Sequence, residues 1–139
     1  MIKLPASLKT LDLSNNPSLA QETYRVLAEE VIERNFCKLE KLNLEGCRIN
    51  DTGLKPLAKA IEYCNSLKHL DLSRNMISDL GALDLADMII GNNGLLVLFL
   101  HWNKLLPRGG AAIAKSLCKN NVLQILDISY CSMGGARES

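Results

Sequence analysis

A short pattern of leucines and polar residues occurs five times along this chain of 139 residues. Each copy has apolar residues at its first, fourth and sixth positions and asparagine or cysteine at its ninth. The copies begin at Leu8, Leu39, Leu67, Leu95 and Leu123, and from Leu39 onward the interval is 28 residues. A pattern that recurs at a constant interval of this length is typical of a repeat protein. The alternation of apolar and polar residues within each copy predicts a short strand with its leucines on one face.

The second half of each unit predicts a helix. Small and aliphatic residues recur at the same interval, and their spacings of one, three and four positions fit one face of a helix. The recurring sets are Gly53, Leu57, Ala58 and Ile61, then Gly81, Leu85, Ala86 and Ile89, and then Gly109, Ile113, Ala114 and Leu117. The polar pairs Asn50-Asp51 and Ser78-Asp79 are candidate helix caps. The first unit is longer, with one extra residue expected before its helix and two after it.

These units resemble the ribonuclease-inhibitor-like class of leucine-rich repeats, from about Leu8 to Met133. The resemblance implies an α/β solenoid, a right-handed β-α superhelix with a parallel sheet on the concave face and helices on the convex face. Simple energetics agree, because one unit cannot bury its own leucines whereas stacked units share a continuous core. Burial of each leucine contributes about 1.5–3 kcal/mol before entropy is subtracted. In this class the ninth residue, here Asn16, Cys47, Asn75, Asn103 or Cys131, satisfies buried backbone groups.

The repeats predict a single domain over residues 1–139, with about four and a half units. Its strands are expected near residues 8–13, 39–44, 67–72, 95–100 and 123–128. The chain stops at "MGGARES", where the helix of the fifth unit should begin. Since terminal repeats need a polar cover, two interpretations follow. We favour part of a longer solenoid; the alternative is that the open ends meet another chain, which includes self-association.

Composition narrows the classes of partner. The formal net charge of +1 gives no general attraction to nucleic acid or to an anionic membrane. No apolar run approaches the roughly 18 residues of a membrane span, and the charged, patterned start "KLPASLKTLDLS" does not fit a signal peptide. The five cysteines are an odd number without a metal-ligand spacing. They favour a reducing, cytoplasmic location, and we expect no metal and no cofactor.

Four surface positions of each unit are expected to lie on or beside the concave face. They are the third, fifth and seventh, which alternate with the leucines, and the eighth, at the exit of the strand. In the first three repeats these positions are polar or charged, whereas in repeats four and five they are largely apolar and aromatic. The candidate partner-binding residues are Val97, Phe99, His101, Trp102, Ile125 and Tyr130, edged by Arg74 and Asp127.

Such an exposed apolar cluster often marks an interaction site, and Trp, Tyr and Arg dominate interface hot spots. The alternative is that Phe99 and Trp102 pack on each other or on a further repeat. Other candidates are weaker: Asp71 and Asp127 lie two strands apart, roughly 10 Å, which is too far for one metal. His69 and His101 occupy different positions of neighbouring strands, and "PRGGAA" lacks the lysine of a phosphate-binding loop.

The sequence therefore predicts a non-enzymatic scaffold that binds a protein partner through its concave face, chiefly repeats four and five. The resemblance supports this, because proteins of the class present their curved surface or its edges to other proteins. Two alternatives remain open. One is a GTPase-activating protein of the Ran-activator type; Arg74 is the only arginine at the four positions expected on or beside the concave face. The other is a structural module within a larger assembly.

Overall fold

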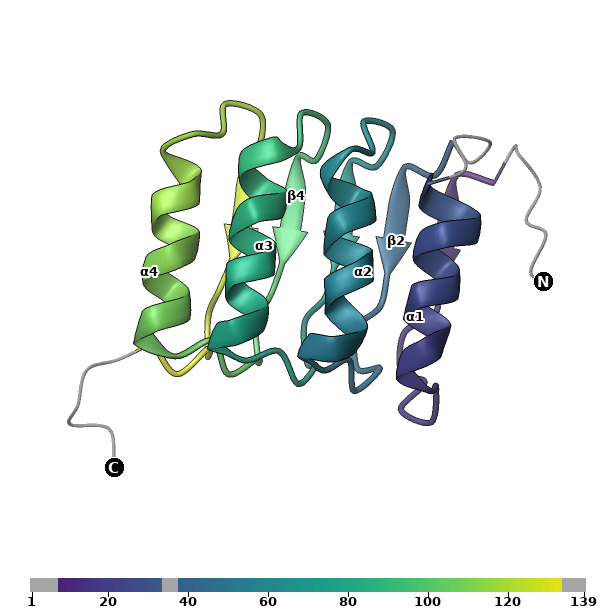
Figure 1. Ribbon diagram of the computed structural model, residues 1–139, viewed down its shortest axis with the longest axis horizontal. Coiled ribbons are helices and arrows are strands. Elements are labelled where there is room, and N and C mark those ends of the chain that lie inside the picture. Colours follow the sequence, from purple (N-terminus) through teal and green to yellow (C-terminus); the bar gives the residue numbers. More distant parts are fainter. Residues whose placement is uncertain (1–7, 34–37, 134–139) are drawn as a thin grey trace.

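A computed structural model describes residues 8–33 and 38–133. Strands and helices alternate along the chain, as the repeats predict (Figure 1). The strands are β1 (Thr10–Asp12), β2 (Lys41–Asn43), β3 (His69–Asp71), β4 (Val97–Phe99) and β5 (Ile125–Asp127). The helices are α1 (Gln21–Leu27), which continues as the π-helix η1 (Ala28–Glu33), α2 (Asp51–Glu62), α3 (Asp79–Gly91) and α4 (Leu106–Leu117).

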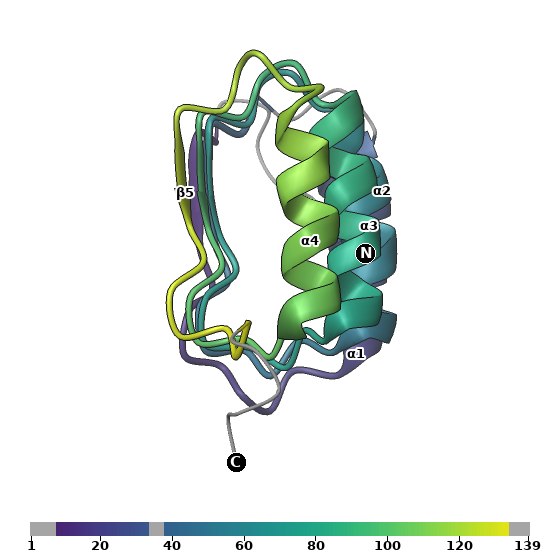
Figure 2. The same ribbon diagram turned by 90° about the vertical axis from the view of Figure 1, so that its left-hand side faces the viewer.

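The five strands form one parallel sheet in the order β1-β2-β3-β4-β5. Its register aligns the central leucine of every strand, as for Leu70 opposite Leu98. The sheet and the helices form two layers (Figure 2), which confirms the predicted α/β solenoid. Each strand occupies only the middle of its predicted stretch, although bonding between repeats continues beyond it. For example, the N–H of Leu72 donates to the carbonyl oxygen of Phe99 at 2.9 Å.

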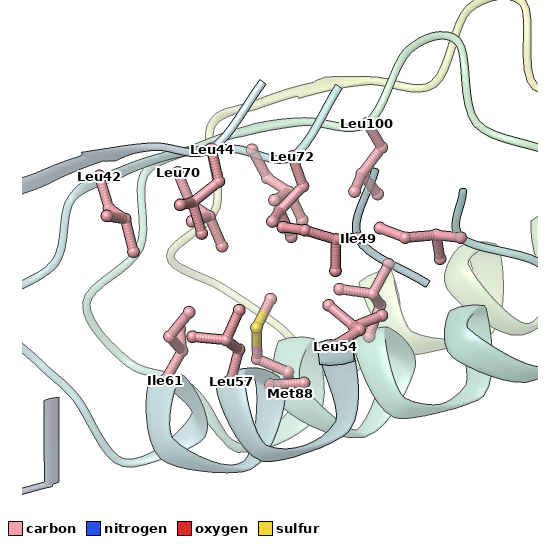
Figure 3. Close-up of a cluster of buried hydrophobic side chains, with 14 of the residues drawn as sticks. Leu42, Leu44, Ile49, Leu54, Leu57, Ile61, Leu70, Leu72, Met88 and Leu100 are labelled. Carbon is pink, nitrogen blue, oxygen red and sulfur yellow. The ribbon is translucent and has the colours of Figure 1, made fainter. Parts of the chain in front are cut away.

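The leucines of the central repeats fill the space between the two layers. Figure 3 shows Leu42 and Leu44 of the sheet layer pointing toward Leu57 and Ile61 of α2, and all four side chains are buried. The equivalent residues of the outer repeats are only partly buried: Leu8, Leu11 and Leu13 at one end, and Leu123, Leu126 and Ile128 at the other. The core is therefore best closed where a repeat has neighbours on both sides.

The residues at the ninth position form a ladder of hydrogen bonds to buried backbone groups, as the family resemblance implies. The side-chain oxygen of Asn75 accepts hydrogen bonds from the N–H groups of Cys47 and Ile49, at 3.1 and 2.9 Å. Its amide nitrogen donates to the carbonyl oxygens of Leu44 and Leu72, both at 2.9 Å. One buried side chain thus satisfies the loops of two repeats. Buried backbone groups without partners are costly, so this residue ties adjacent units together.

Cysteine at the ninth position makes only some of the hydrogen bonds that asparagine makes there. The thiol of Cys47 donates to the carbonyl oxygen of Leu13 at 3.0 Å, and that of Cys131 donates to Leu100 at 3.1 Å. Both cysteines are free and buried. A thiol is a weak donor and offers little acceptor capacity, so these rungs replace only part of an asparagine. The packing role predicted for the two cysteines is confirmed.

A second asparagine ladder lies between the helices and the following strands, and the sequence interpretation missed it. The amide nitrogen of Asn92 donates to the carbonyl oxygens of Ile61 and Cys64, at 2.6 and 3.1 Å. Its oxygen accepts from the N–H of Leu95 at 2.7 Å. Asn120 bonds to Ile89 at 2.7 Å in the same way. The two asparagines are one repeat interval apart, so the spacing itself contained the signal.

Local signals explain where the helices begin. The side chain of Asn50 accepts from the N–H of Gly53, and that of Ser78 accepts from Leu80, which confirms both predicted caps. Between β1 and α1 the chain uses residues 13–20, one more than the 44–50 segment between β2 and α2. The predicted extra residue before the first helix is therefore present. The π-helix η1 widens the last turns of that helix, which accommodates added length.

Candidate functional site

The residue at the eighth position of every repeat has an unusual backbone conformation. Its residues all have positive φ: Asn15 (58°), Gly46 (67°), Arg74 (54°), Trp102 (58°) and Tyr130 (55°). Bulky residues rarely adopt this region, which costs roughly 1–2 kcal/mol per residue. Hydrogen bonds to the next repeat hold it here, since the N–H of Arg74 donates to His101 at 2.8 Å and that of Trp102 to Ser129 at 3.2 Å. The fold thus imposes this conformation on whatever residue stands there.

Three of these side chains form a stack that runs across the repeats. The rings of Trp102 and Tyr130 lie nearly parallel, with centroids 4.6 Å apart and an angle of 10°. From the preceding repeat, the guanidinium carbon of Arg74 lies 5.7 Å from the Trp102 ring centroid. The Nε atom of Arg74 is in turn 3.3 Å from a carboxylate oxygen of Glu45. Trp102 is therefore held between a cation and a second ring, while 49% of it remains exposed.

The strands that precede this stack carry an exposed or half-buried apolar surface, here called the apolar floor, which consists of Val97, Phe99 and Ile125. Val97 of β4 is paired in register with Ile125 of β5. Val97 and Phe99 are half-buried, whereas 53% of Ile125 is exposed. Phe99 presents an edge-to-face contact to His69 of β3, with ring centroids 5.2 Å apart at 88°. Burial lowers the pKa of His69, with a further contribution from the charge of Lys41, and both favour the neutral ring.

His101 lies between the apolar floor and the edge of the sheet. Its ring centroid is 6.2 Å from that of Phe99. Its Nδ1 atom is 3.5 Å from a carboxylate oxygen of Asp127, yet this buried nitrogen makes no hydrogen bond to any described residue. A contact of this length is weak and does not meet the geometry of a hydrogen bond. The imidazole therefore faces Asp127 without being locked to it.

The aspartates of the fifth position have a structural task. Each accepts a hydrogen bond from the backbone N–H of the serine two residues later: Asp12 from Ser14, Asp71 from Ser73 and Asp127 from Ser129. Side-chain and backbone hydrogen bonds from Ser129 lower the pKa of Asp127, so this carboxylate is charged at neutral pH. Phe99 cannot make such a turn. The fourth repeat therefore replaces a turn-forming residue with an apolar one.

Two sequence-based expectations need correction. The seventh position was predicted to face the concave surface; Ser129 is exposed and Ser14, Glu45 and His101 are half-buried, but Ser73 is fully buried. The strand ends two residues earlier and the backbone turns at the eighth position, so this side chain is drawn into the turn. The alternative that Phe99 and Trp102 pack on each other is also incorrect. Phe99 contacts the rings of His69 and His101, whereas Trp102 stacks on Tyr130.

The other predicted residues come together on one side of the sheet. Val97, Phe99, His101, Trp102, Ile125 and Tyr130 occupy β4, β5 and the turns that follow them, and we call these six residues the aromatic patch. Arg74 and Asp127 contact it at its edges. The sequence interpretation missed Glu45 and His69, which orient Arg74 and contact Phe99. Both lie at surface positions of neighbouring repeats, so the parallel register would have identified them.

Among residues 8–33 and 38–133, no group of three or more His, Cys, Asp or Glu side chains is arranged to hold a metal ion. Within the same ranges, none of the helices has the length and apolar character needed to cross a membrane. The concave face presents the apolar and aromatic side chains of β4 and β5 beside the charged groups of Lys41, Arg74 and Asp127.

Leucine-rich repeat families match most of the repeated region. One leucine-rich repeat model matches residues 37–58, 63–86 and 119–136, and a second matches residues 7–23. The ribonuclease inhibitor of Sus scrofa is 40% identical over 69 residues, which cover 50% of this chain and 15% of that protein. The ribonuclease inhibitor of Mus musculus is 33% identical over 75 residues, or 54% and 16% of the two chains. The chain therefore spans only a small part of the length of these relatives.

Two solved structures share the fold. Leiomodin-1 actin-binding site 2 superposes with a TM-score of 0.80 at 20% identity, covering 88% of this chain and 71% of that one. The tropomodulin C-terminal domain of Caenorhabditis elegans gives a TM-score of 0.78 at 21% identity, covering 92% and 77%. At this identity the likeness concerns the fold alone. The repeat-family matches show that the chain belongs to the leucine-rich repeat proteins, and its identity with the two ribonuclease inhibitors makes it ribonuclease-inhibitor-like.

Proposed function

We propose that this protein is a non-enzymatic scaffold that binds a protein partner through the aromatic patch on its concave face. The observation that carries the proposal is the exposed stack of Trp102 on Tyr130 beside the apolar floor of Val97, Phe99 and Ile125. The core has no need of these side chains, because the leucines already fill it. Exposed apolar clusters of this kind are typical of interaction surfaces.

The geometry favours affinity because the patch is ordered before a partner arrives. A hydrogen bond to Ser129 fixes the backbone of Trp102, and the contacts with Arg74 and Tyr130 restrict its side chain. Immobilising a free side chain on binding costs about 0.5–1.5 kcal/mol. A partner that docks on rings already held in place avoids most of that cost.

The polar repeats would set the orientation of the partner. Lys41 is exposed and Asn43, His69 and Asp71 are half-exposed along β2 and β3. Charged groups at the rim of an interface contribute more to specificity than to affinity, since like charges reject mismatched surfaces. Recognition would thus divide into apolar anchors from repeats four and five and polar selection from the others.

The names of the similar proteins support a protein as the partner class. The matched relatives are inhibitors of a ribonuclease, and leiomodin-1 contributes a site named for actin binding. These statements describe those proteins, and the identity of the partner here remains to be measured. No observation favours the Ran-activator alternative, because the Arg74 guanidinium is occupied by Glu45 and Trp102. A GTP hydrolysis assay with Ran tests it directly.

Affinity capture tests the proposal. The unaltered chain is compared with Trp102→Ala and Phe99→Ala, and with Lys41→Ala as a matched surface control on the polar side. Captured proteins are identified by mass spectrometry, and the affinity of each recovered protein is then measured with purified components. We expect each aromatic variant to weaken binding by at least about tenfold, as hot-spot truncations do, while Lys41→Ala changes it little. Equal binding by all variants that remain folded would reject the patch.

A further inference from the structure

The outer face of α3 is apolar where the other helices are polar. Leu80, Leu83 and Ile90 project from it with exposed fractions of 59%, 39% and 43%. They follow the spacing of one helix face, with the exposed Asp87 between them. The equivalent residues of α2, one repeat earlier, are Thr52, Lys55, Lys59 and Glu62. The leucine core therefore does not explain this exposed apolar surface.

The neighbouring outer face of α4 carries small and basic residues instead. The equivalents one repeat later are Arg108, Ala111, Lys115 and Cys118, all exposed. No acidic residue occurs in the sequence between Asp87 and Asp127, and no lysine or arginine occurs between Arg74 and Lys104. The helix α3 thus carries only negative charge and α4 only positive charge. Figure 1 looks onto this pair of adjacent helices.

Asp87 and Lys115 occupy equivalent positions on these two helices. Neither forms an ion pair with a described residue of the same chain, whereas Arg108 of α4 lies 4.0 Å from Asp79 of α3. On its other side α3 meets charges that balance its own, because Asp84 and Asp87 line a groove with Lys55 and Lys59 of α2. The uncompensated positive charge therefore lies on the α4 side.

We infer that this face binds a second copy of the chain about a twofold axis that runs parallel to the helices, between α3 and α4. Such an axis places α3 of one copy over α4 of the other at the same height, and the reverse. A twofold interface must be self-complementary, and these two helices are complementary in charge. Asp87 would face Lys115 of the second copy, and Lys115 would face Asp87 of the second copy.

The shapes of the two faces agree with this pairing. At the same height, the large Leu83 lies opposite Ala111 of the second copy, and Ile90 lies opposite Cys118 of the second copy. Leu80 meets the aliphatic stem of Arg108 of the second copy, a role that long basic side chains commonly take. Large residues of one helix thus fall on small residues of the other, so the backbones can approach closely.

A membrane surface fits this face less well than a second copy does. Asp87 stands inside the apolar stripe at an exposed position, and insertion of this face into the lipid boundary would remove its charge from water. The outer faces of α2 and α3 also carry Lys55, Lys59, Glu62, Asp84 and Asp87, so their charges offset one another rather than attracting anionic lipid. The second copy supplies a cation opposite each Asp87.

The proposed dimer is weak and has a consequence for binding. Only two helices per copy meet, which places it among small interfaces of less than about 1,200 Å². Convex faces in contact leave the two concave faces pointing outward, so the dimer would present two aromatic patches. Bivalent binding to a repeated partner would then be tighter than binding by one copy, through effective concentration rather than through new contacts.

Sedimentation equilibrium of the full chain from about 10 μM to 1 mM tests the dimer, with a dissociation constant in the micromolar range expected of so small an interface. Asp87→Lys and Lys115→Asp should each weaken dimerisation about tenfold or more, because each creates two like-charge pairs. The double variant restores both pairs and should return within about threefold of the unaltered chain. Leu83→Glu should remove the dimer, whereas Lys41→Asp on the concave face should leave it unchanged.

Three outcomes would overturn the inference: a monomer at every concentration, a double variant as weak as its parents, or a dimer that tolerates Leu83→Glu. All of the altered residues are exposed, so the unfolding midpoint should remain close to that of the unaltered chain. The midpoint is measured for each variant, so a loss of dimer can be separated from a loss of fold.

Discussion

Repeats three and four show how one framework carries two different surfaces. Their strands pair in register, and their eighth residues have nearly the same φ, 54° and 58°. At the four surface positions, however, repeat three has His69, Asp71, Ser73 and Arg74, whereas repeat four has Val97, Phe99, His101 and Trp102. The leucines and asparagines specify the backbone, and the surface positions are left free for other purposes.

This comparison also separates two kinds of polar residue. Asn75 and Asn103 are buried and bind the backbone of adjacent repeats. Asp71 and Asp127 only form short turns at the surface. Substitution of the first kind should damage the fold in either half of the molecule. Substitution at the surface positions should matter for binding, and chiefly in the aromatic half.

The largest effect on stability is expected from loss of the asparagine ladder at the ninth position of the repeats. Asn75→Ala leaves two N–H groups and several carbonyl oxygens without their partner, and each buried unsatisfied group costs about 1–3 kcal/mol. After relaxation we expect a loss of about 3–5 kcal/mol in the free energy of unfolding, measured by urea denaturation. Asn103→Ala should cost a comparable amount, although its repeat has a different surface. Asn43→Ala, at a surface position, is the control and should cost less than about 1 kcal/mol.

A smaller effect is expected within the stack. The parallel contact between Trp102 and Tyr130 predicts a coupling energy of about 0.5–1.5 kcal/mol between the two rings. A double-mutant cycle with Trp102→Ala and Tyr130→Ala, followed by thermal or urea unfolding, measures it. A coupling energy of zero would mean that the rings do not order one another. The pair Lys41 and His69, at surface positions of the polar half, provides the comparison without a stacked contact.

The smallest effect concerns pH. Hydrogen bonds from Ser129 lower the pKa of Asp127 below the usual value of about 3.9. The stabilisation is therefore fully present above that value and is lost as the pH falls toward the lower pKa of the folded state. Because the carboxylate is largely exposed, we expect less than about 1 kcal/mol. Ser129→Ala should raise the pKa of Asp127, read from the carboxyl chemical shift during an NMR titration; an unchanged pKa would contradict the assigned cause.

Much of this architecture could be read from the sequence because leucine spacing reports burial directly. The constant interval predicted the strands and the helices, and the polar residues before the helices predicted the caps at Asn50 and Ser78. The resemblance to leucine-rich repeats implied the ladder at the ninth position. It also placed Trp102 and Tyr130 at exposed positions. These features depend on which face a residue occupies, and periodicity determines the face.

Other features depend on geometry that spacing does not encode. The stack of Trp102 on Tyr130 follows from a positive φ imposed by hydrogen bonds between repeats. The burial of Ser73 follows from the same turn. The π-helix after α1 arises where extra residues must fit between a fixed strand and a fixed helix face.

The most direct test of the aromatic patch gives repeat four the surface of repeat three. The altered chain carries Val97→His, Phe99→Asp, His101→Ser and Trp102→Arg, and its affinity for the captured partner is measured by calorimetry. A control chain carries Lys41→His and Asn43→Asp, which give repeat two residues of repeat three. We expect the first chain to fold but to bind at least about 30-fold more weakly, a loss of about 2 kcal/mol, while the control keeps its affinity. A folded repeat-four variant that binds as tightly as the unaltered chain would contradict the account.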